Sequence, residues 1–364
     1  MEHSFTATIK SVLAEFFGEA RAERLFEESY LIQYLNIKMK SADRGSKARS
    51  SFANLYALYV LIEDYVKGGF YQNGLYKSYE GASFSTLFAR QRQLPFGDKL
   101  QNHALNNRLN AEFEKYFPLV QAVPIIRDLE KSKYWVNENL LILNQSNERT
   151  NLAQAVLRII DEYIQSKSNA IEVFIAKCEE LRQVNASESV PFIRSLLAAN
   201  TDARLFEIVS YAILKNYYQN EVIYWGYSLD DLHKDFLKLY KTGRTNANDG
   251  GIDFVMKPLG RFFQVTETLD FKKYFLDIDK VQRYPITFVI KSNESLETMR
   301  NVIEQNARKT FAIESVIQDY MSCLEELINI PILLERLESV INYKGINDIM
   351  EEIILQSKVE FNQY

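Results

Sequence analysis

The sequence is poor in the residues that build disulfide frameworks and histidine-rich metal centres. Its 364 residues include two cysteines and three histidines, and neither Cys178 nor Cys323 belongs to a CxxC pair. A disulfide scaffold and a structural zinc site are therefore not expected. This cysteine usage fits a protein of the reducing cytoplasm.

Long hydrophobic runs and the common nucleotide motifs are also missing. No stretch approaches 18 consecutive apolar residues, which argues against a membrane span, and the first residues lack the basic and apolar regions of a secretory signal. The patterns GxxxxGK[ST], GxGxxG, HExxH and GxSxG do not occur. P-loop ATP chemistry and other use of a nucleotide cofactor are therefore not expected.

Glycine and proline are sparse, at 13 and 7 residues, which favours long helices over many short strands. Apolar positions recur at helical spacing in several segments. We expect helices over 5–40, 50–66, 99–116, 150–183, 202–218 and 293–364. Asp202 is a plausible N-cap for the helix that follows it, because a short carboxylate can accept from the free amides of a first turn.

The middle of the sequence reads differently. Residues 221–228 are β-rich, 250–268 read as two strands joined by a tight turn at 258–260, and 285–292 form an apolar run typical of a buried strand. The expected order is α-β-β-β-α-β. We therefore expect an α/β (α+β) fold with a mixed central β-sheet flanked by helices, and large, mostly helical additions at both ends.

Charge is unevenly distributed along the chain. The formal net charge is −5, but residues 311–364 alone carry ten acids and three bases, whereas 41–110 carry nine bases and five acids. Phosphate binding needs a local positive surface rather than a positive total. The composition therefore permits a nucleic-acid partner without indicating one.

The candidate chemistry lies between Asp253 and Thr266. Asp253 begins one expected strand, and Gln264 and Thr266 lie two residues apart on the next, so that their side chains share a face. A carboxylate with an amide oxygen is the ligation that Mg²⁺ prefers. Glu207, on the preceding helix, can supply a second carboxylate.

These residues carry a resemblance to a known family. The sequence has Phe206-Glu207 on a helix, then Asp249-Gly250-Gly251-Ile252-Asp253, then Gln264-Val265-Thr266, then an apolar strand. This order resembles the core of the PD-(D/E)XK nucleases, and the motifs themselves are most similar to those of the Mrr-type branch. The resemblance covers roughly residues 200–292. The resemblance implies a restriction-endonuclease-like core in which Asp253, Gln264 and Glu207 bind Mg²⁺.

One position departs from the family pattern. The family's lysine is replaced by Thr266, and a neutral hydroxyl cannot stabilise a developing oxyanion as an ammonium does. Either a lysine from elsewhere reaches the site, with Lys257, Lys272 and Lys273 as candidates, or Glu267 does acid-base or metal work. Strand alternation puts Glu267 on the face opposite Gln264, so the second alternative needs a β-bulge. We favour Thr266 at the site together with a migrated lysine such as Lys257.

The resemblance implies a type II restriction endonuclease that hydrolyses double-stranded DNA at a specific sequence with Mg²⁺. Cutting both strands of a palindromic site fits a homodimer, which we expect. A modification-dependent endonuclease and a non-catalytic DNA-binding or scaffold protein with a decayed site are the alternatives. We expect three regions: 1–199 for DNA recognition, 200–295 as the catalytic core, and 296–364 for bracing or dimerisation. Arginine, asparagine and glutamine can read base edges, and the candidate DNA-binding residues are Arg44, Lys47, Arg49, Arg90, Arg92, Gln101, Asn102, His103 and Arg108.

Overall fold

The computed structural model of the chain describes residues 2–40, 48–98, 100–145, 148–183, 186–198, 201–243, 252–267, 271–342 and 345–361. The chain divides into two compact units, residues 1–171 (unit 1) and 172–364 (unit 2). The boundary falls inside one long helix, α9 (Ala153–Gln183). Each unit has a hydrophobic core of its own.

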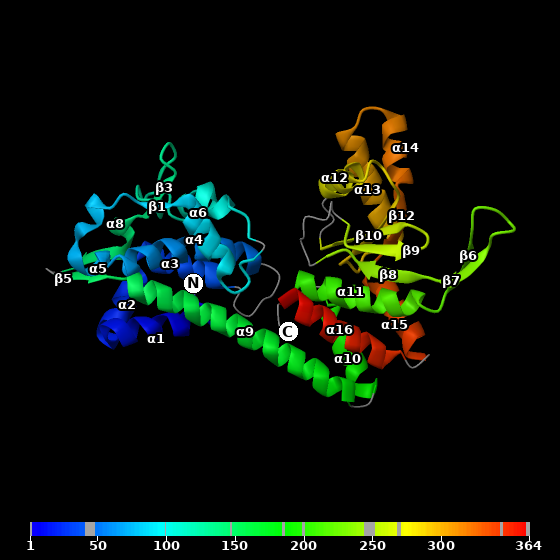
Figure 1. Ribbon diagram of the computed structural model, residues 1–364, viewed down its shortest axis with the longest axis horizontal. Coiled ribbons are helices and arrows are strands. Elements are labelled where there is room, and N and C mark those ends of the chain that lie inside the picture. Colours follow the sequence, from blue (N-terminus) through cyan, green and yellow to red (C-terminus); the bar gives the residue numbers. More distant parts are fainter. Residues whose placement is uncertain are drawn as a thin grey trace. The chain divides into compact units, whose positions relative to one another are not determined.

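Unit 1 is mainly helical (Figure 1). Its core is rich in aromatic rings, and Tyr34, Tyr56, Tyr65 and Phe113 are fully buried. The helices before α9 are α1 (Thr6–Phe17), α2 (Glu19–Glu28), α3 (Tyr30–Met39), α4 (Ala48–Lys67), α5 (Phe70–Asn73), α6 (Phe84–Gln93), α7 (Leu109–Tyr116) and α8 (Glu138–Leu141), with one turn of 3₁₀ helix at Leu75–Ser78 and a π-helical turn at Ala104–Arg108.

Two small sheets complete unit 1. The first contains three antiparallel strands in the order β1 (Ala82–Ser83), β3 (Lys133–Val136) and β2 (Ile125–Asp128). The second pairs β4 (Ile142–Gln145) with β5 (Glu148–Asn151). These strands were not expected from the sequence, because each is only two to four residues long and too short to show a periodic pattern.

Unit 2 is built around a five-stranded sheet in the order β12-β11-β10-β9-β8. The strands are β8 (Lys238–Lys241), β9 (Phe254–Lys257), β10 (Arg261–Thr266), β11 (Ile286–Ile290) and β12 (Leu324–Ile328). β9 runs antiparallel to both β8 and β10, whereas β10, β11 and β12 are parallel. Every residue of β11 is buried, which confirms the strand expected from the apolar run 285–292.

Helices cover both faces of this sheet (Figure 1). On one face, α11 (Ala203–Tyr218), α15 (Ile330–Asn342) and α16 (Ile346–Phe361) share a core with Phe254, Phe263 and Val289. On the other face, α12 (Phe271–Lys280), α13 (Leu296–Thr310) and α14 (Glu314–Ser322) share a core with Phe288 and Ile290. The remaining helix of unit 2 is α10 (Ala186–Leu196). The expected α/β class with helices flanking a mixed sheet is thus confirmed.

The N-terminal boundary of α11 is encoded locally. The Asp202 side chain accepts a hydrogen bond from the Arg204 amide at 2.7 Å, as expected for an N-cap. Eleven of the helix residues are buried, among them Phe206 and Glu207. With this start, Glu207 is the fifth residue of α11. Its side chain is buried and therefore directed into the unit rather than towards solvent.

Three expectations on secondary structure are corrected. Residues 5–40 form three helices, because the chain leaves helical geometry at Gly18 and Ser29. Residues 221–228 do not supply a strand of the main sheet. Their strand β6 (Val222–Trp225) pairs only with β7 (His233–Phe236) in a separate hairpin, and β8 takes the expected place in the sheet.

The third correction concerns the C-terminal region, which we expected to be helical throughout. Leu324–Ile328 form β12, with Leu324, Leu327 and Ile328 buried. Without β12, the outer edge of β11 would leave backbone donors and acceptors unpaired inside the unit. Pairing with β11 therefore outweighs the local helical pattern of residues 324–328. β12 belongs to the same sheet as β11, and α15 and α16 share a hydrophobic core with α11 inside unit 2.

Candidate functional site

Polar side chains gather at one edge of the sheet of unit 2. Because of the strand directions, the end of β8, the start of β9 and the ends of β10 and β11 all meet at this edge. We call it the polar edge and define it by Lys241, Thr242, Asp253, 264–267 and Lys291. The start of α11 lies at the same edge, since the Lys291 ammonium donates to the carbonyl of Thr201.

Asp253 is held at the polar edge by contacts on both sides. Its carboxylate oxygen Oδ2 accepts from the Val265 amide at 2.6 Å, and its own amide donates to the carbonyl of Phe263 at 2.9 Å. Its carbonyl accepts from the Thr242 amide at 2.9 Å. The residue is 8% exposed. The carboxylate therefore stands where β9 and β10 separate, in a fixed position.

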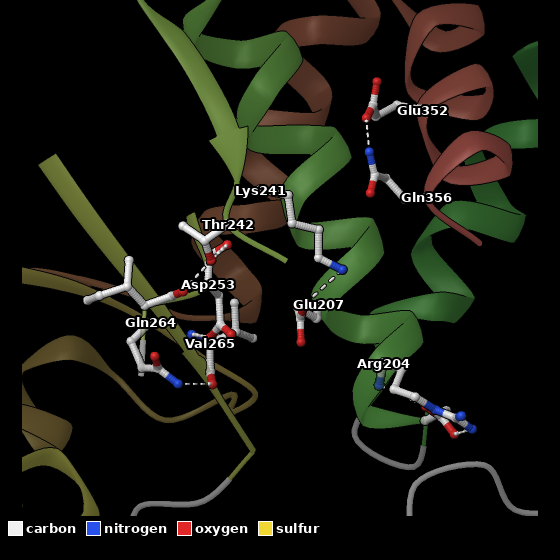
Figure 2. Close-up of polar contacts among 11 residues, drawn as sticks. Arg204, Glu207, Lys241, Thr242, Asp253, Gln264, Val265, Glu352 and Gln356 are labelled. Atoms are coloured by element: carbon white, nitrogen blue, oxygen red, sulfur yellow. Dashed lines mark hydrogen bonds and ion pairs between the residues drawn. The ribbon is translucent and has the colours of Figure 1, made fainter. Parts of the chain in front are cut away.

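Gln264 lies beside Asp253 on β10. Its Nε2 donates to the Val265 carbonyl at 3.2 Å, so Asp253 and Gln264 both contact the backbone of Val265 (Figure 2). The Gln264 Oε1 atom is buried and has no hydrogen-bond partner among the described residues. Such an unsatisfied buried acceptor is unusual in a native structure and calls for an explanation.

Thr266 is 4% exposed and pairs in register with Ile290, just as Gln264 pairs with Phe288. Both therefore belong to the face of the sheet that α12 covers. Glu207 belongs to the core on the opposite face, and Figure 2 shows it on the other side of Asp253 from the Gln264 amide. The structure thus brings Asp253 and Gln264 together, while Glu207 approaches from the α11 face.

Glu207 forms a buried ion pair that the sequence did not indicate. Its Oε1 lies 2.9 Å from Nζ of Lys241, and the two side chains are 6% and 7% exposed. Lys241 ends β8 and is in register with Phe254, the residue after Asp253. We missed Lys241 because β8 was not expected. Leu239 and Lys241 lie two residues apart on that strand and therefore share a face, and this spacing is the signal that was available in the sequence.

A second buried lysine lies at the same edge. Lys291 Nζ is 2.9 Å from Glu267 Oε1, and its side chain is 4% exposed. The Lys291 amide donates to the carbonyl of Thr266 at 2.9 Å, which places Lys291 directly after the end of β11. Glu267 follows the last residue of β10, so strand alternation no longer fixes its direction, and no bulge is needed for it to meet Lys291.

Lys257 lies away from the polar edge. It ends β9, four residues beyond Asp253, which corresponds to about 13 Å along a strand. Its exposed ammonium lies 5.7 Å from the ring centroid of Tyr240. The structure therefore does not bring Lys257 to Asp253. The side chains of Lys272 and Lys273 lie outside the part of the structure that is described.

The candidate DNA-binding residues of unit 1 differ in their surroundings. Arg90 binds both oxygens of Glu63, at 2.8 and 2.9 Å, and this carboxylate raises the pKa of Arg90. Arg92 is exposed and donates to the carbonyl of Asp98 at 2.8 Å. The other described residues of the set lie at the π-helical turn Ala104–Arg108: Gln101, Asn102 and His103 precede it, and Arg108 ends it. Gln101, His103 and Arg108 are exposed, and Asn102 is half-buried. Arg44, Lys47 and the side chain of Arg49 lie outside the described residues.

Within the described ranges, no group of three or more His, Cys, Asp and Glu side chains is arranged to hold a metal ion, and no helix is both long and apolar enough to cross a membrane. Comparison with known proteins gives no further indication. No family model, curated protein or solved structure matches this chain.

Proposed function

We propose that this chain is a Mg²⁺-dependent DNA endonuclease of the type II restriction kind, with its reaction centre at the polar edge of unit 2. The observation that carries the proposal is the position of Asp253. Asp253 immediately precedes β9, so that α11 with Glu207, β9, β10 with Gln264 and the buried strand β11 follow one another in the order of the motifs on which the PD-(D/E)XK resemblance rests.

The energetics of the polar edge support a functional role. Two lysine side chains are buried there, and the Lys241–Glu207 ion pair is buried on both sides, whereas Glu267, the partner of Lys291, is 37% exposed. The desolvation of a buried ion pair often outweighs the attraction between its charges. Replacement of a buried ion pair by apolar side chains of similar volume is often neutral or stabilising. Concentrated buried charge in one place is typical of functional sites.

The side chains at Asp253 fit a magnesium ion. Asp253 offers a carboxylate and Gln264 the buried oxygen Oε1 that lacks a partner among the described residues, and oxygen ligands of this kind suit Mg²⁺. Glu207 lies on the other side of Asp253 from the Gln264 amide, with its Oε1 2.9 Å from Nζ of Lys241. When bound, Mg²⁺ supplies a positive charge that lowers the pKa of a coordinated water and neutralises charge on a phosphate.

The reaction that follows is hydrolysis of a phosphodiester. The oxygen of a water molecule bonds to phosphorus and gives up a proton, one ester P–O bond breaks, and the leaving oxygen takes up a proton, so that the net reaction adds one water across the ester bond. Asp253 would hold its position through the Val265 amide during this step. The carboxylates alone would repel the phosphate, so the reaction depends on cations at the polar edge.

The test is digestion of DNA of known sequence by the purified full chain with Mg²⁺, followed by mapping of the ends. We expect discrete fragments, and no cleavage when EDTA replaces the metal. Comparison of methylated with unmethylated DNA identifies a modification-dependent enzyme. DNA binding without cleavage in Mg²⁺, Mn²⁺ or Ca²⁺ would contradict the enzyme proposal and favour a binding protein with a decayed site. Sedimentation of the protein–DNA complex tests the proposed homodimer.

Unit 1 is the proposed source of DNA recognition, and its exposed arginines allow a direct test. We expect Arg92→Ala and Arg108→Ala each to weaken DNA binding and to lower the salt dependence of the binding constant, by about 0.9 in the log–log slope for each lost phosphate contact. Arg90→Ala is the matched control, because Glu63 already neutralises Arg90. Equal slopes for all four proteins, measured by titration at several salt concentrations, would remove this surface from the DNA interface.

A further inference from the structure

The proposed reaction needs a cationic side chain, and Thr266 does not supply one. Thr266 is buried, belongs to the sheet face covered by α12, and follows the same pleat as Gln264. A neutral hydroxyl in that position cannot take the place of an ammonium beside a phosphate. The polar edge, however, contains two lysines, which makes it necessary to decide between Lys241 and Lys291.

Lys291 is held as a brace between chain segments. Its ammonium binds Glu267 at the end of β10 and the carbonyl of Thr201 before α11, and it lies 5.8 Å from the ring centroid of Phe206. These contacts join the ends of β10 and β11 to the start of the helix. Because the Lys291 ammonium donates to a backbone carbonyl and to a carboxylate at once, two of its three donors already stabilise the fold.

Lys241 has a different setting. Its strand is the direct neighbour of β9, and the Thr242 amide that follows it donates to the Asp253 carbonyl at 2.9 Å. The ammonium is held by Glu207 at 2.9 Å, and Figure 2 shows both groups on the same side of Asp253. The Glu207 carboxylate therefore fixes the position of the Lys241 ammonium through a charge-assisted hydrogen bond.

We propose that Lys241 is the cationic catalytic residue of this site, contacting a non-bridging oxygen of the scissile phosphate, with Glu207 as the residue that positions it. This inference rests on the proposed endonuclease function. In the step described above, the ammonium stabilises the negative charge that grows on the phosphoryl oxygens as water adds and the ester bond breaks. No proton leaves Lys241, so the balance of the hydrolysis is unchanged.

The experiment compares Lys241→Met with Lys291→Met in the full chain. Each variant removes one buried lysine from the polar edge, but the glutamate that remains differs, since Glu207 is 6% exposed and Glu267 is 37% exposed, so both variants are assayed at a temperature at which each is folded. We expect Lys241→Met to lower the single-turnover cleavage rate at saturating DNA by at least about 100-fold. Lys291→Met should lower the melting temperature but cleave within about tenfold of the unaltered protein when assayed well below that temperature.

A second comparison remains informative if Lys241→Met does not fold. Glu207→Gln retains the Lys241 ammonium, whereas Glu207→Gln with Lys241→Gln leaves a neutral pair and no uncompensated charge. We expect the double variant to cleave at least about 100-fold more slowly than Glu207→Gln, with DNA affinity in Ca²⁺ unchanged. Equal rates for these two proteins, or full activity of folded Lys241→Met, would overturn the role of Lys241 while leaving the endonuclease proposal intact. Absence of cleavage by the unaltered protein overturns both.

Discussion

Asp253→Asn is expected to lower Mg²⁺-dependent DNA cleavage by at least about 100-fold while leaving DNA binding intact. The change removes the negative charge that a cation needs, but asparagine keeps an oxygen that can accept from the Val265 amide, as the carboxylate does at 2.6 Å. The strand ends should therefore keep their arrangement. The measurements are single-turnover cleavage of a mapped DNA site and binding of the same DNA in Ca²⁺.

Asp277→Asn is the matched control for this variant. Asp277 is also buried, at 2% exposure, and is held by Lys280 at 2.8 Å, but it lies on α12 away from the strand ends. We expect it to cleave normally. Unimpaired cleavage by folded Asp253→Asn would remove Asp253 from the mechanism, and with it the observation on which the proposed function depends.

The second large effect concerns stability. Phe263 is fully buried in the sheet core between α11 and β9, with ring centroids of Tyr218 and Phe254 at 6.2 and 6.4 Å. We expect Phe263→Ala to lower the free energy of unfolding by about 3–5 kcal/mol, because the lost contacts leave a cavity that the sheet and helix cannot close. Urea-induced unfolding followed by far-UV circular dichroism measures the change.

Phe236→Ala serves as the comparison, since Phe236 is 46% exposed on the β6–β7 hairpin. This change should alter the free energy of unfolding by no more than about 0.5 kcal/mol. Similar losses in the two variants would mean that Phe263 is not part of a tightly packed core. Hydrogen exchange of β9 and β10 locates the effect within unit 2.

Local sequence patterns predict some strands of the main sheet and not others. The buried run at 286–290 and the turn between β9 and β10 were readable because their signals are local: continuous apolar residues, and proline with glycine at 258–260. β8 and β12 were not readable. β8 is four residues long and has no turn signal that links it to β9, and β12 lies inside a segment whose apolar residues recur at helical spacing.

The site divides in the same way. Asp253 and Gln264 could be chosen from the sequence because they lie on two strands of one hairpin, where spacing along the chain predicts proximity. Lys241 could not be paired with Glu207, and Lys291 could not be paired with Glu267, because both contacts join separate elements. Lys257 seemed suitable by alternation alone, but alternation gives the face of a strand and not the distance along it.

The amino-acid sequence by itself determined the helix-rich α/β character of this protein, the Asp202 cap of α11 and the hairpin that carries Asp253 and Gln264, because short-range geometry governs all three. Only the tertiary structure decided that β12 joins the sheet and that two buried lysines face two glutamates at its edge. Those features depend on which backbone and charged groups must find partners once water is excluded, and such partners come from any distance along the chain.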